Sequence, residues 1–251
     1  MNTDDQLPVA MFSGTIVQDY DLLKLICPLS EEMSEIVGLV IRRYPNNSAP
    51  LSVVELGGGT GITTQPILMA NNSLQVLTVD SDPDMQAQAK ENLQKWIDNK
   101  RLTFCTNDAL SALKTLASNS VDIVASAYTL HNFLIDYREQ VINEIFRVLK
   151  PDGQFINGDR YALDDISEHT RLTQQDASHF FKVLIAANKP DLLEQWILHL
   201  FSDEAENHII RESVALAQLK NAGFIDIQLS HRMNVNALVT ATKPTQEKQD
   251  V

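Results

Sequence analysis

Short strand-like runs alternate with amphipathic stretches along most of the chain. Residues that favour buried strands occupy five segments, at 51–54, 74–79, 102–106, 121–127 and 154–157. Between and after them, apolar residues recur at helical spacing, at about 62–69, 84–98, 109–116 and 137–149. Because strands that alternate with helices form parallel sheets covered on both faces, the pattern predicts an α/β fold.

The two ends of the chain depart from this alternation. Ser30 is the expected N-cap of a helix that reaches about Arg43, and we expect residues 1–45 to form an N-terminal helical cap. Two final strand patterns, at 225–229 and 237–241, predict an antiparallel pair. The predicted fold class is therefore a Rossmann-like, doubly wound, seven-stranded sheet that is mostly parallel, with an antiparallel last strand.

The segment after the fifth strand is longer than a usual crossover. Residues 161–221 hold no strand pattern and predict only helices, at about 166–188, 190–201 and 205–221. An insertion above the carboxyl ends of strands is placed to act as a substrate lid or as a dimer contact. We therefore expect a core at 46–251 with a helical lid insertion at about 161–221, and a homodimer through the insertion is one interpretation.

A cluster of glycines follows the first strand. The segment reads Glu55-Leu56-Gly57-Gly58-Gly59-Thr60-Gly61, and glycines in a strand–turn–helix unit tolerate positive φ and let a ligand approach the backbone. Asp80 ends the second strand 19 residues after Gly61, where an acidic side chain can accept hydrogen bonds from a ribose. The spacing fits neither the dinucleotide fingerprint G-x-G-x-x-G nor a P-loop.

The motif E-x-G-x-G-x-G at 55–61 resembles the first motif of the class I S-adenosylmethionine (SAM)-dependent methyltransferases. The resemblance extends through Asp80 and Asn107-Asp108 to about residue 160. It implies that SAM is the cofactor and that Asp108 accepts a hydrogen bond from the adenine amino group. It also implies that an aromatic residue before the core covers the cofactor; Tyr20 is the candidate, and packing between the cap and the core is its alternative. An N-cap role in the following helix is an alternative for Asp108. The cofactor-binding residues implied by the resemblance are Tyr20, Glu55, Gly57, Gly58, Gly59, Gly61, Asp80, Ser81, Met85, Asn107, Asp108, Ala109 and Ala127.

The fourth strand ends in the segment Ala127-Tyr128-Thr129-Leu130-His131-Asn132. Because ligands bind at strand carboxyl ends in open α/β sheets, Tyr128 and His131 are the candidate catalytic residues. His131 is the candidate general base, although a hydrogen-bonded histidine that caps the next helix is an equal alternative. The candidate substrate contacts are Asn132, Arg160 and Tyr161. No cluster of metal ligands is visible in the sequence, and we expect no metal.

Composition and charge argue against nucleic-acid and membrane partners. The chain has 251 residues, of which 33 are acidic and 20 basic; its net charge of −13 repels phosphate backbones, so we expect no nucleic-acid partner. Two distant cysteines, Cys27 and Cys105, favour neither a disulfide framework nor a zinc site. No apolar run reaches the ~18 residues of a membrane span, and the chain opens on polar, acidic residues, so we expect a cytoplasmic protein with no membrane partner.

These features predict a SAM-dependent methyltransferase that acts on O or N of a small-molecule acceptor. The helical content after the fifth strand is also similar to the carboxy-SAM synthases, which need arginines for an additional carboxylate, and the sequence does not place a matching arginine between residues 194 and 211. A non-catalytic SAM-binding subunit or sensor is a further alternative. A nucleic-acid methyltransferase is disfavoured because Ser126-Ala127-Tyr128-Thr129 stands where an N-P-P-Y-like tetrad would be.

Overall fold

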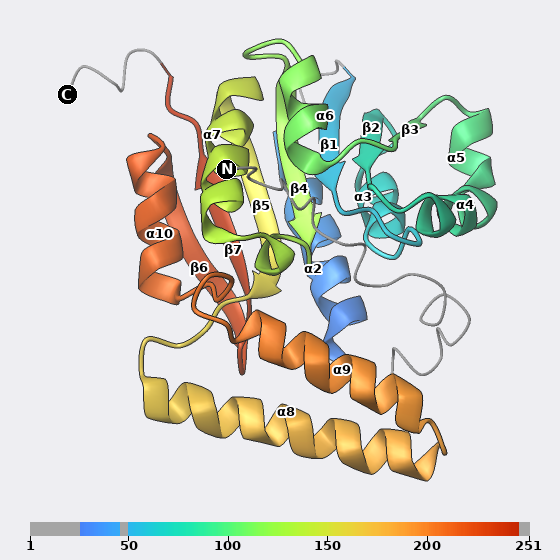
Figure 1. Ribbon diagram of the computed structural model, residues 1–251. Helices are drawn as coiled ribbons and strands as arrows, with labels where there is room; N and C mark the ends of the chain where they lie inside the picture. The colour runs from blue at the N-terminus through green and yellow to red at the C-terminus, as the bar shows by residue number, and fades with distance from the viewer. Residues whose placement is uncertain (1–25, 46–49, 246–251) are drawn as a thin grey trace, which may run out of the picture.

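A seven-stranded sheet forms the centre of the molecule (Figure 1). The computed structural model describes residues 26–45 and 50–245. The strands follow the order β3-β2-β1-β4-β5-β7-β6. Strands β1 to β5 pair in parallel, and β7 runs antiparallel to both β5 and β6, which confirms the predicted fold class. The strands span Leu51–Leu56 (β1), Leu74–Val79 (β2), Leu102–Cys105 (β3), Val121–Ala127 (β4), Leu149–Arg160 (β5), Ile225–Met233 (β6) and Asn236–Thr242 (β7).

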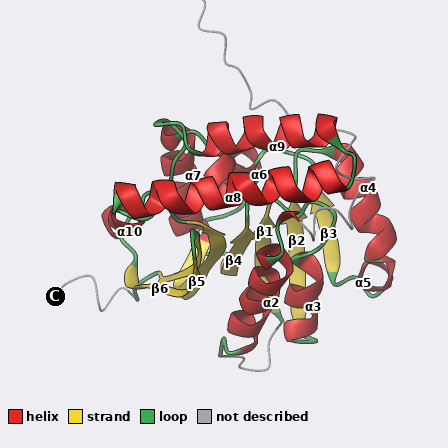
Figure 2. Cartoon of the chain, turned by 90° about the horizontal axis from the view of Figure 1, so that it is seen from below, coloured by secondary structure: helices red, strands yellow, loops and turns green. Residues whose placement is uncertain are grey.

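Side chains of the central strands alternate between two apolar cores, one on each face of the sheet. Val54 and Val124 belong to one core, and their chain neighbours Val53 and Ile123 belong to the other. Helices cover both faces (Figure 2). One face carries α2 (Leu29–Arg42), α3 (Thr64–Ala70), α4 (Pro83–Asn92) and α5 (Gln94–Asp98), and the other carries α6 (Ala109–Thr115), α7 (Ile135–Val148) and α10 (Glu212–Asn221).

Helix α2 packs into one of these cores. Met33, Val37 and Ile41 recur at a spacing of four and are almost fully buried, and each contributes roughly 1.5–3 kcal/mol relative to exposure. The N-cap of α2 is Pro28, so the prediction of Ser30 was wrong; the Ser30 hydroxyl instead donates to a backbone carbonyl three residues earlier, at 2.8 Å. Helix α2 packs directly against the sheet. The division of the chain into a cap and a core at residue 45 stays a prediction.

Two long helices form a hairpin below the sheet in the view of Figure 1, across the carboxyl ends of the strands. They are α8 (Ile166–Ala186) and α9 (Pro190–Asp203), the predicted insertion. The chain enters and leaves this hairpin at adjacent points, since Ala162 and Arg211 pair in an isolated bridge. No helix in the described part of the chain has both the length and the apolar character for crossing a membrane. The hairpin has an apolar cluster of its own, made of Ile26, Phe180, Leu184, Leu192, Trp196 and Leu200.

The third helix of this region is shorter than predicted. Helix α10 begins at Glu212, whereas the pattern predicted a helix from about residue 205. The segment before it follows an irregular path because the buried Arg138 of α7 donates hydrogen bonds to the carbonyls of His208 (2.7 Å) and Ile209 (3.5 Å). Tertiary contacts therefore override the local helical pattern here.

The helix predicted at 84–98 is divided in two. Helix α4 ends at Asn92 and α5 begins at Gln94, with Leu93 between them in a non-helical conformation (φ −113°, ψ 15°). Leu93 is fully buried, and a Cβ added to Gly61 would lie 2.7 Å from its Cδ1. The backbone thus follows this leucine into the core, beneath the glycine turn.

The turn predicted at 150–153 lies within β5. The register between β4 and β5 shifts between Val121 and Ile123, and Asp152 has a positive φ of 62°. The turn residues therefore form a bulge at the start of a strand that is longer than predicted.

Candidate active site

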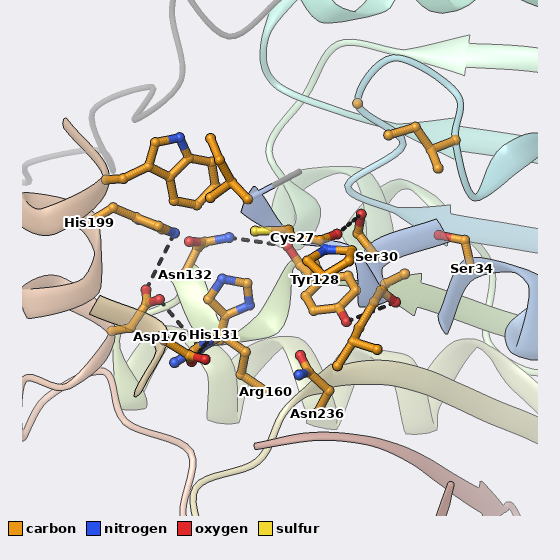
Figure 3. A pocket seen from close by; sticks show the side chains of 18 of the residues that line it. Cys27, Ser30, Ser34, Tyr128, His131, Asn132, Arg160, Asp176, His199 and Asn236 are labelled. Carbon is orange, nitrogen blue, oxygen red and sulfur yellow. Dashed lines mark hydrogen bonds and ion pairs between the residues drawn. The ribbon is translucent and has the colours of Figure 1, made fainter. Parts of the chain in front are cut away.

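A cavity of about 480 Å³ lies between the strand ends and the hairpin. Its walls come from the segment before α2, the glycine turn, the ends of β4 and β5, and the sides of α8 and α9 that face the sheet (Figure 3). The structure therefore brings the middle of the glycine turn together with both predicted catalytic residues. The predicted site residues that line the cavity are Gly57, Gly58, Gly59, Met85, Ala127, Tyr128, His131, Asn132 and Arg160.

The glycine turn has a packed side and an open side. Gly57 has a φ of +72°, and a Cβ there would lie only 1.9 Å from Thr129 Oγ1. Gly59 has a φ of +51°, and no atom of the described residues lies within 4 Å of the place where its Cβ would be. Because Gly59 also lines the cavity, a ligand can approach the backbone at this point, as the fit of a nucleoside-like cofactor requires.

Glu55 lies behind the turn rather than in the cavity wall. It is fully buried, its Oε2 accepts a hydrogen bond from Thr64 Oγ1 at 2.6 Å, and its Oε1 has no partner among the described residues. Burial raises the pKa of Glu55 to about 7, although the hydrogen bond from Thr64 opposes this shift. Its position supports the turn from beneath.

Asp80 holds the turn through backbone hydrogen bonds. Its Oδ2 accepts from the N–H of Gly59 at 2.7 Å and its Oδ1 accepts from the N–H of Asp82 at 2.9 Å. Burial raises the pKa of Asp80, and these two hydrogen bonds oppose the rise. A carboxylate offers about four acceptor positions, so two remain for hydroxyl groups of a ligand.

Asp108 caps a helix, as its alternative interpretation predicted. Its Oδ1 accepts from the N–H of Ser111 at 3.0 Å and from the hydroxyl of Tyr137 at 2.7 Å. Although burial raises the pKa of Asp108, these hydrogen bonds hold it below its usual range. Asp82 plays the same N-cap role for α4, accepting from the N–H of Asp84 and Met85.

Several predicted site residues lie outside the cavity wall. Tyr161 is buried in the sheet core, where its hydroxyl accepts a hydrogen bond from Asn157 at 2.7 Å, so its side chain does not reach the cavity. Gly61 packs against Leu93. Tyr20 lies outside the described residues. The other predicted cofactor residues that do not line the cavity are Glu55, Asp80, Ser81, Asn107, Asp108 and Ala109.

His131 is joined to a carboxylate that the sequence analysis missed. Its Nδ1 lies 2.6 Å from Oδ1 of Asp159, and both residues are buried. Asp159 also accepts from the backbone N–H of Leu130 (2.9 Å) and of Arg160 (2.8 Å), which fixes the carboxylate. The sequence did offer one indication of this role, because Asp159 is an acidic residue at the carboxyl end of the fifth strand. The pair is a histidine held by a buried carboxylate, with the imidazole Nε2 left for other contacts.

His131 and Asp159 shift each other's pKa in opposite directions. Burial lowers the pKa of His131, but the charges of Asp159 and Asp203 outweigh burial and raise it above its usual value. Burial raises the pKa of Asp159, but His131 and the hydrogen bonds to the carboxylate hold it below its usual range. The carboxylate therefore stabilises the proton on the imidazole.

Tyr128 occupies a strained backbone position beside His131. Its φ is +51°, which is unusual for a residue with a bulky side chain and costs on the order of 1–3 kcal/mol. Its N–H donates to Gly158 O at 2.9 Å, and Asn132 Nδ2 donates to its carbonyl at 3.3 Å. These contacts hold the strained turn and direct the ring against the cavity, where the hydroxyl meets Leu29 O at 3.4 Å.

Arg160 is surrounded by carboxylates of the hairpin. Its guanidinium lies 3.4 Å from Asp176 of α8 and 3.5 Å from both Asp203 and Glu204 at the end of α9. Burial alone would lower the pKa of Arg160, but these three charges raise it. The predicted substrate contact at Arg160 is therefore already engaged by protein carboxylates.

The hairpin adds His199 to the cavity, a residue that the sequence did not single out. Its ring centroid lies 5.9 Å from that of His131, and its Nε2 lies 3.6 Å from Asp203 Oδ1 (Figure 3 shows both histidines). Burial, together with the charges of His131 and Arg160, lowers the pKa of His199 to about 3. His131 and His199 are far apart in sequence, so only the folded hairpin brings them together.

Residues 54–157 match the family model described as Methyltransferase domain. The chain carries a class I SAM-dependent methyltransferase domain. SAM is the cofactor of this family, and the open glycine turn and Asp80 fit a nucleoside-like group. The helical hairpin at 166–203 lies beyond the matched residues.

Relatives of the methyltransferase domain differ in what their names say they do. A demethylmenaquinone methyltransferase from Leptospira interrogans is 34% identical over 48% of this chain and 47% of its own length. A carboxy-SAM synthase from Ruthia magnifica is 22% identical over 78% of this chain and 80% of its own length. The match to the first of these spans about half of that relative, so it describes the domain and not the whole chain.

Solved structures extend the likeness of fold to the rest of the chain. An O-methyltransferase family protein from Burkholderia thailandensis has a TM-score of 0.64 at 17% identity, over 88% of this chain and 58% of that one. The carbon methyltransferase CurJ has a TM-score of 0.63 at 17% identity, over 90% and 59% of the two chains. At this identity the likeness concerns the fold alone.

Proposed function

We propose that the protein transfers a methyl group from SAM to an oxygen or nitrogen atom of a small molecule bound in the cavity. The observation that carries the proposal is the buried His131–Asp159 pair, whose histidine lines the same cavity as the open side of the glycine turn. SAM, when bound, supplies a methyl group on a positive sulfonium, which is already electrophilic. The protein then has to align the acceptor, exclude water and remove a proton.

We divide these tasks among residues that line the cavity and two carboxylates outside its wall, Asp80 and Asp108. We assign cofactor binding to the glycine turn, with Asp80 accepting from the ribose and Asp108 from the adenine amino group. We assign proton removal to Nε2 of His131, while Asp159 keeps the other ring proton on Nδ1 and stabilises the imidazolium that forms. The hairpin covers the strand ends and serves as a lid.

The far wall indicates the character of the acceptor. Phe180, Trp196 and Leu200 of the hairpin line the cavity with large apolar side chains. The rings of Phe180 and Trp196 lie 5.7 Å apart between centroids, and that of Trp196 lies 5.6 Å from His199. Such a wall favours an aromatic or largely apolar acceptor that carries one hydroxyl or amine.

The test measures S-adenosylhomocysteine release with a panel of phenols and amines, using chelator-treated protein. Against the best acceptor of the panel, we expect His131→Asn to lower kcat by roughly 10²–10⁴-fold, the usual contribution of a general base. The affinity for SAM, measured by calorimetry, should stay unchanged. The exposed His231→Asn serves as the matched control. Full activity of the folded His131→Asn variant would rule out the base role.

Carboxy-SAM synthesis is the second candidate, because the relative of that name matches 78% of this chain. An additional carboxylate on SAM calls for an arginine. Among the described residues that line the cavity, Arg160 is the arginine present, and three carboxylates already hold it. Arg211, which lies in the expected stretch, donates instead to Leu163 O at 2.6 Å. Methyl transfer is therefore favoured, and mass spectrometry of copurified ligands separates the two.

A non-catalytic SAM-binding subunit is the remaining candidate. It predicts SAM binding with no S-adenosylhomocysteine release from any acceptor of the panel. The buried His131–Asp159 pair favours turnover, because a binding protein has no need of a base at the acceptor end of its cavity.

A further inference from the structure

Three side chains with metal-binding atoms converge at the hairpin end of the cavity. His131 comes from the turn after β4, and His199 and Asp203 lie one helical turn apart on α9. One ligand atom from each lies within 4.8 Å of the other two. All three residues line the cavity.

The distances suit a small ion between the three groups. His199 Nε2 and Asp203 Oδ1 are 3.6 Å apart, which is long for a hydrogen bond. Two ligand atoms at about 2.0–2.2 Å from a tetrahedral Zn²⁺ are separated by roughly 3.4 Å. His199 and Asp203 are thus close to the separation that zinc requires, and His131, within 4.8 Å of both, would complete the site by moving closer.

A second carboxylate orients one of the histidines. Asp159 Oδ1 lies 2.6 Å from Nδ1 of His131, so the proton resides on Nδ1 and the lone pair on Nε2. Histidines that bind metals commonly donate their other ring N–H to a carboxylate in this way, which fixes the tautomer and raises the basicity of the ligand nitrogen.

The surrounding charge also calls for a cation. Three carboxylates, Asp176, Asp203 and Glu204, meet one guanidinium, that of Arg160, and a fourth carboxylate, Asp159, pairs with His131. Carboxylates therefore outnumber the guanidinium at this end of the cavity, and Glu204 also pairs with His169. Arg160 Nε approaches Asp203 at Oδ2, and His199 faces Oδ1 of the same carboxylate. One oxygen of Asp203 can thus serve the arginine and the other a metal ion.

We propose that His131, His199 and Asp203 bind one Zn²⁺ with an open fourth position toward the cavity. Two imidazoles and one carboxylate suit zinc, whereas Mg²⁺ and Ca²⁺ prefer sites made of oxygen atoms alone. The zinc site does not rest on the proposed methyl transfer. Bound zinc would occupy Nε2 of His131, so the base role above belongs to the metal-free protein.

The test uses the untagged full chain, stripped with a chelator and titrated with Co²⁺ as a spectroscopic probe. We expect one equivalent to give the visible absorption of tetrahedral Co²⁺, and one equivalent of Zn²⁺ to abolish it. The variants His199→Asn and Asp203→Asn should lose the absorption. Asp159→Asn should weaken binding by roughly 10–100-fold, the usual effect of removing such a supporting carboxylate.

Two controls keep the result specific. Cys27 lines the same cavity, so Cys27→Ala must bind as the wild type does, and so must the exposed His231→Asn. Thermal melting provides a second readout, since Zn²⁺ should raise the Tm of the wild type and leave that of His199→Asn unchanged. Retained binding by folded His199→Asn, binding that follows Cys27, or failure of the wild type to bind Co²⁺ would each overturn the proposal.

Discussion

Single residues beneath the glycine turn set its properties. Glu55 is fully buried, one of its oxygens has no partner in the part of the chain that the structure describes, and burial raises its pKa to about 7. Ionisation of the Glu55 carboxyl is therefore less favourable in the folded protein than in the unfolded chain. Since the folded pKa is the higher one, the native protein retains a proton that the unfolded chain has already released.

We expect the free energy of unfolding to fall as pH rises from about 4.5, the ordinary pKa of the group, through about 7. A shift of this size corresponds to a loss on the order of 3 kcal/mol as an upper limit. Glu55→Gln should remove this part of the pH dependence, because the amide does not ionise. Urea unfolding of both proteins at pH 5 and pH 8 measures the difference, and equal pH dependence in the two would contradict the assignment.

Asp80 links the same turn to the cofactor. Asp80→Ala should weaken the binding of SAM and S-adenosylhomocysteine by about 1–3 kcal/mol, because the ribose contact and the brace on the Gly59 N–H are lost together. Calorimetric titration measures the change. Asp84→Ala, an exposed charge removed from the next helix, should bind as the wild type does. An unchanged affinity in folded Asp80→Ala would exclude the ribose role.

The site residues fall into two groups: those close together in the sequence, and those that only the folded structure brings together. The glycine turn and Asp80 could be predicted because they lie in one strand–turn–helix unit and its neighbour. Asp159, His199 and Asp203 could not be combined with His131, because the four residues lie on three separate elements and the packing of α9 decides their distances. Tyr161 and Arg160 were chosen by their place at a strand end, where the register sends one side chain into the core and the other toward the cavity.

At the scale of elements, the local sequence pattern predicted the bounds correctly where no tertiary contact changes them. The strands at 74–79 and 121–127 have the predicted bounds, because both are rich in apolar residues, most of which are buried in a parallel sheet. The start of α10 and the break at Leu93 could not be predicted. Arg138 and the core position of Leu93 determine them, and both are tertiary contacts.

Within the glycine turn, Gly57 is expected to matter for stability and Gly59 for the binding of SAM. Gly57→Ala should destabilise the protein by well over the roughly 1–2 kcal/mol of a left-handed residue, because its Cβ also overlaps Thr129. Gly59→Ala should cost only the conformational part and instead abolish SAM binding, since its Cβ enters open space. Urea unfolding and calorimetry on the pair provide the comparison. Similar stability losses without an effect on SAM binding would show that the open side holds no ligand.

At the scale of the whole molecule, the hairpin is also a candidate contact between two copies of the chain. Large apolar side chains on its helices are exposed, among them Ile185 (64%), Leu198 (60%) and Phe201 (68%). We propose a homodimer through this surface. In sedimentation velocity, Phe201→Glu should then shift a dimeric wild type toward monomer, whereas Met69→Glu, an exposed apolar residue of α3, should not. A monomeric wild type would exclude this dimer.

The bridge between Ala162 and Arg211 has a consequence for how this chain can be rebuilt. The N–H of Ala162 donates to Ile210 O at 2.7 Å and that of Glu212 to Ala162 O at 2.9 Å, so the two ends of the hairpin segment are fastened to each other before the hairpin begins. Other contacts also hold the segment, since Arg160 of β5 pairs with its carboxylates and Arg138 of α7 donates to the carbonyls of His208 and Ile209. Exchanging residues 163–210 for another segment should therefore alter the far wall of the cavity while the glycine turn stays in place, provided that the new segment keeps the end spacing and supplies partners for Arg160 and Arg138. On the proposed function, we expect such an exchange to change acceptor choice and to leave SAM binding in place.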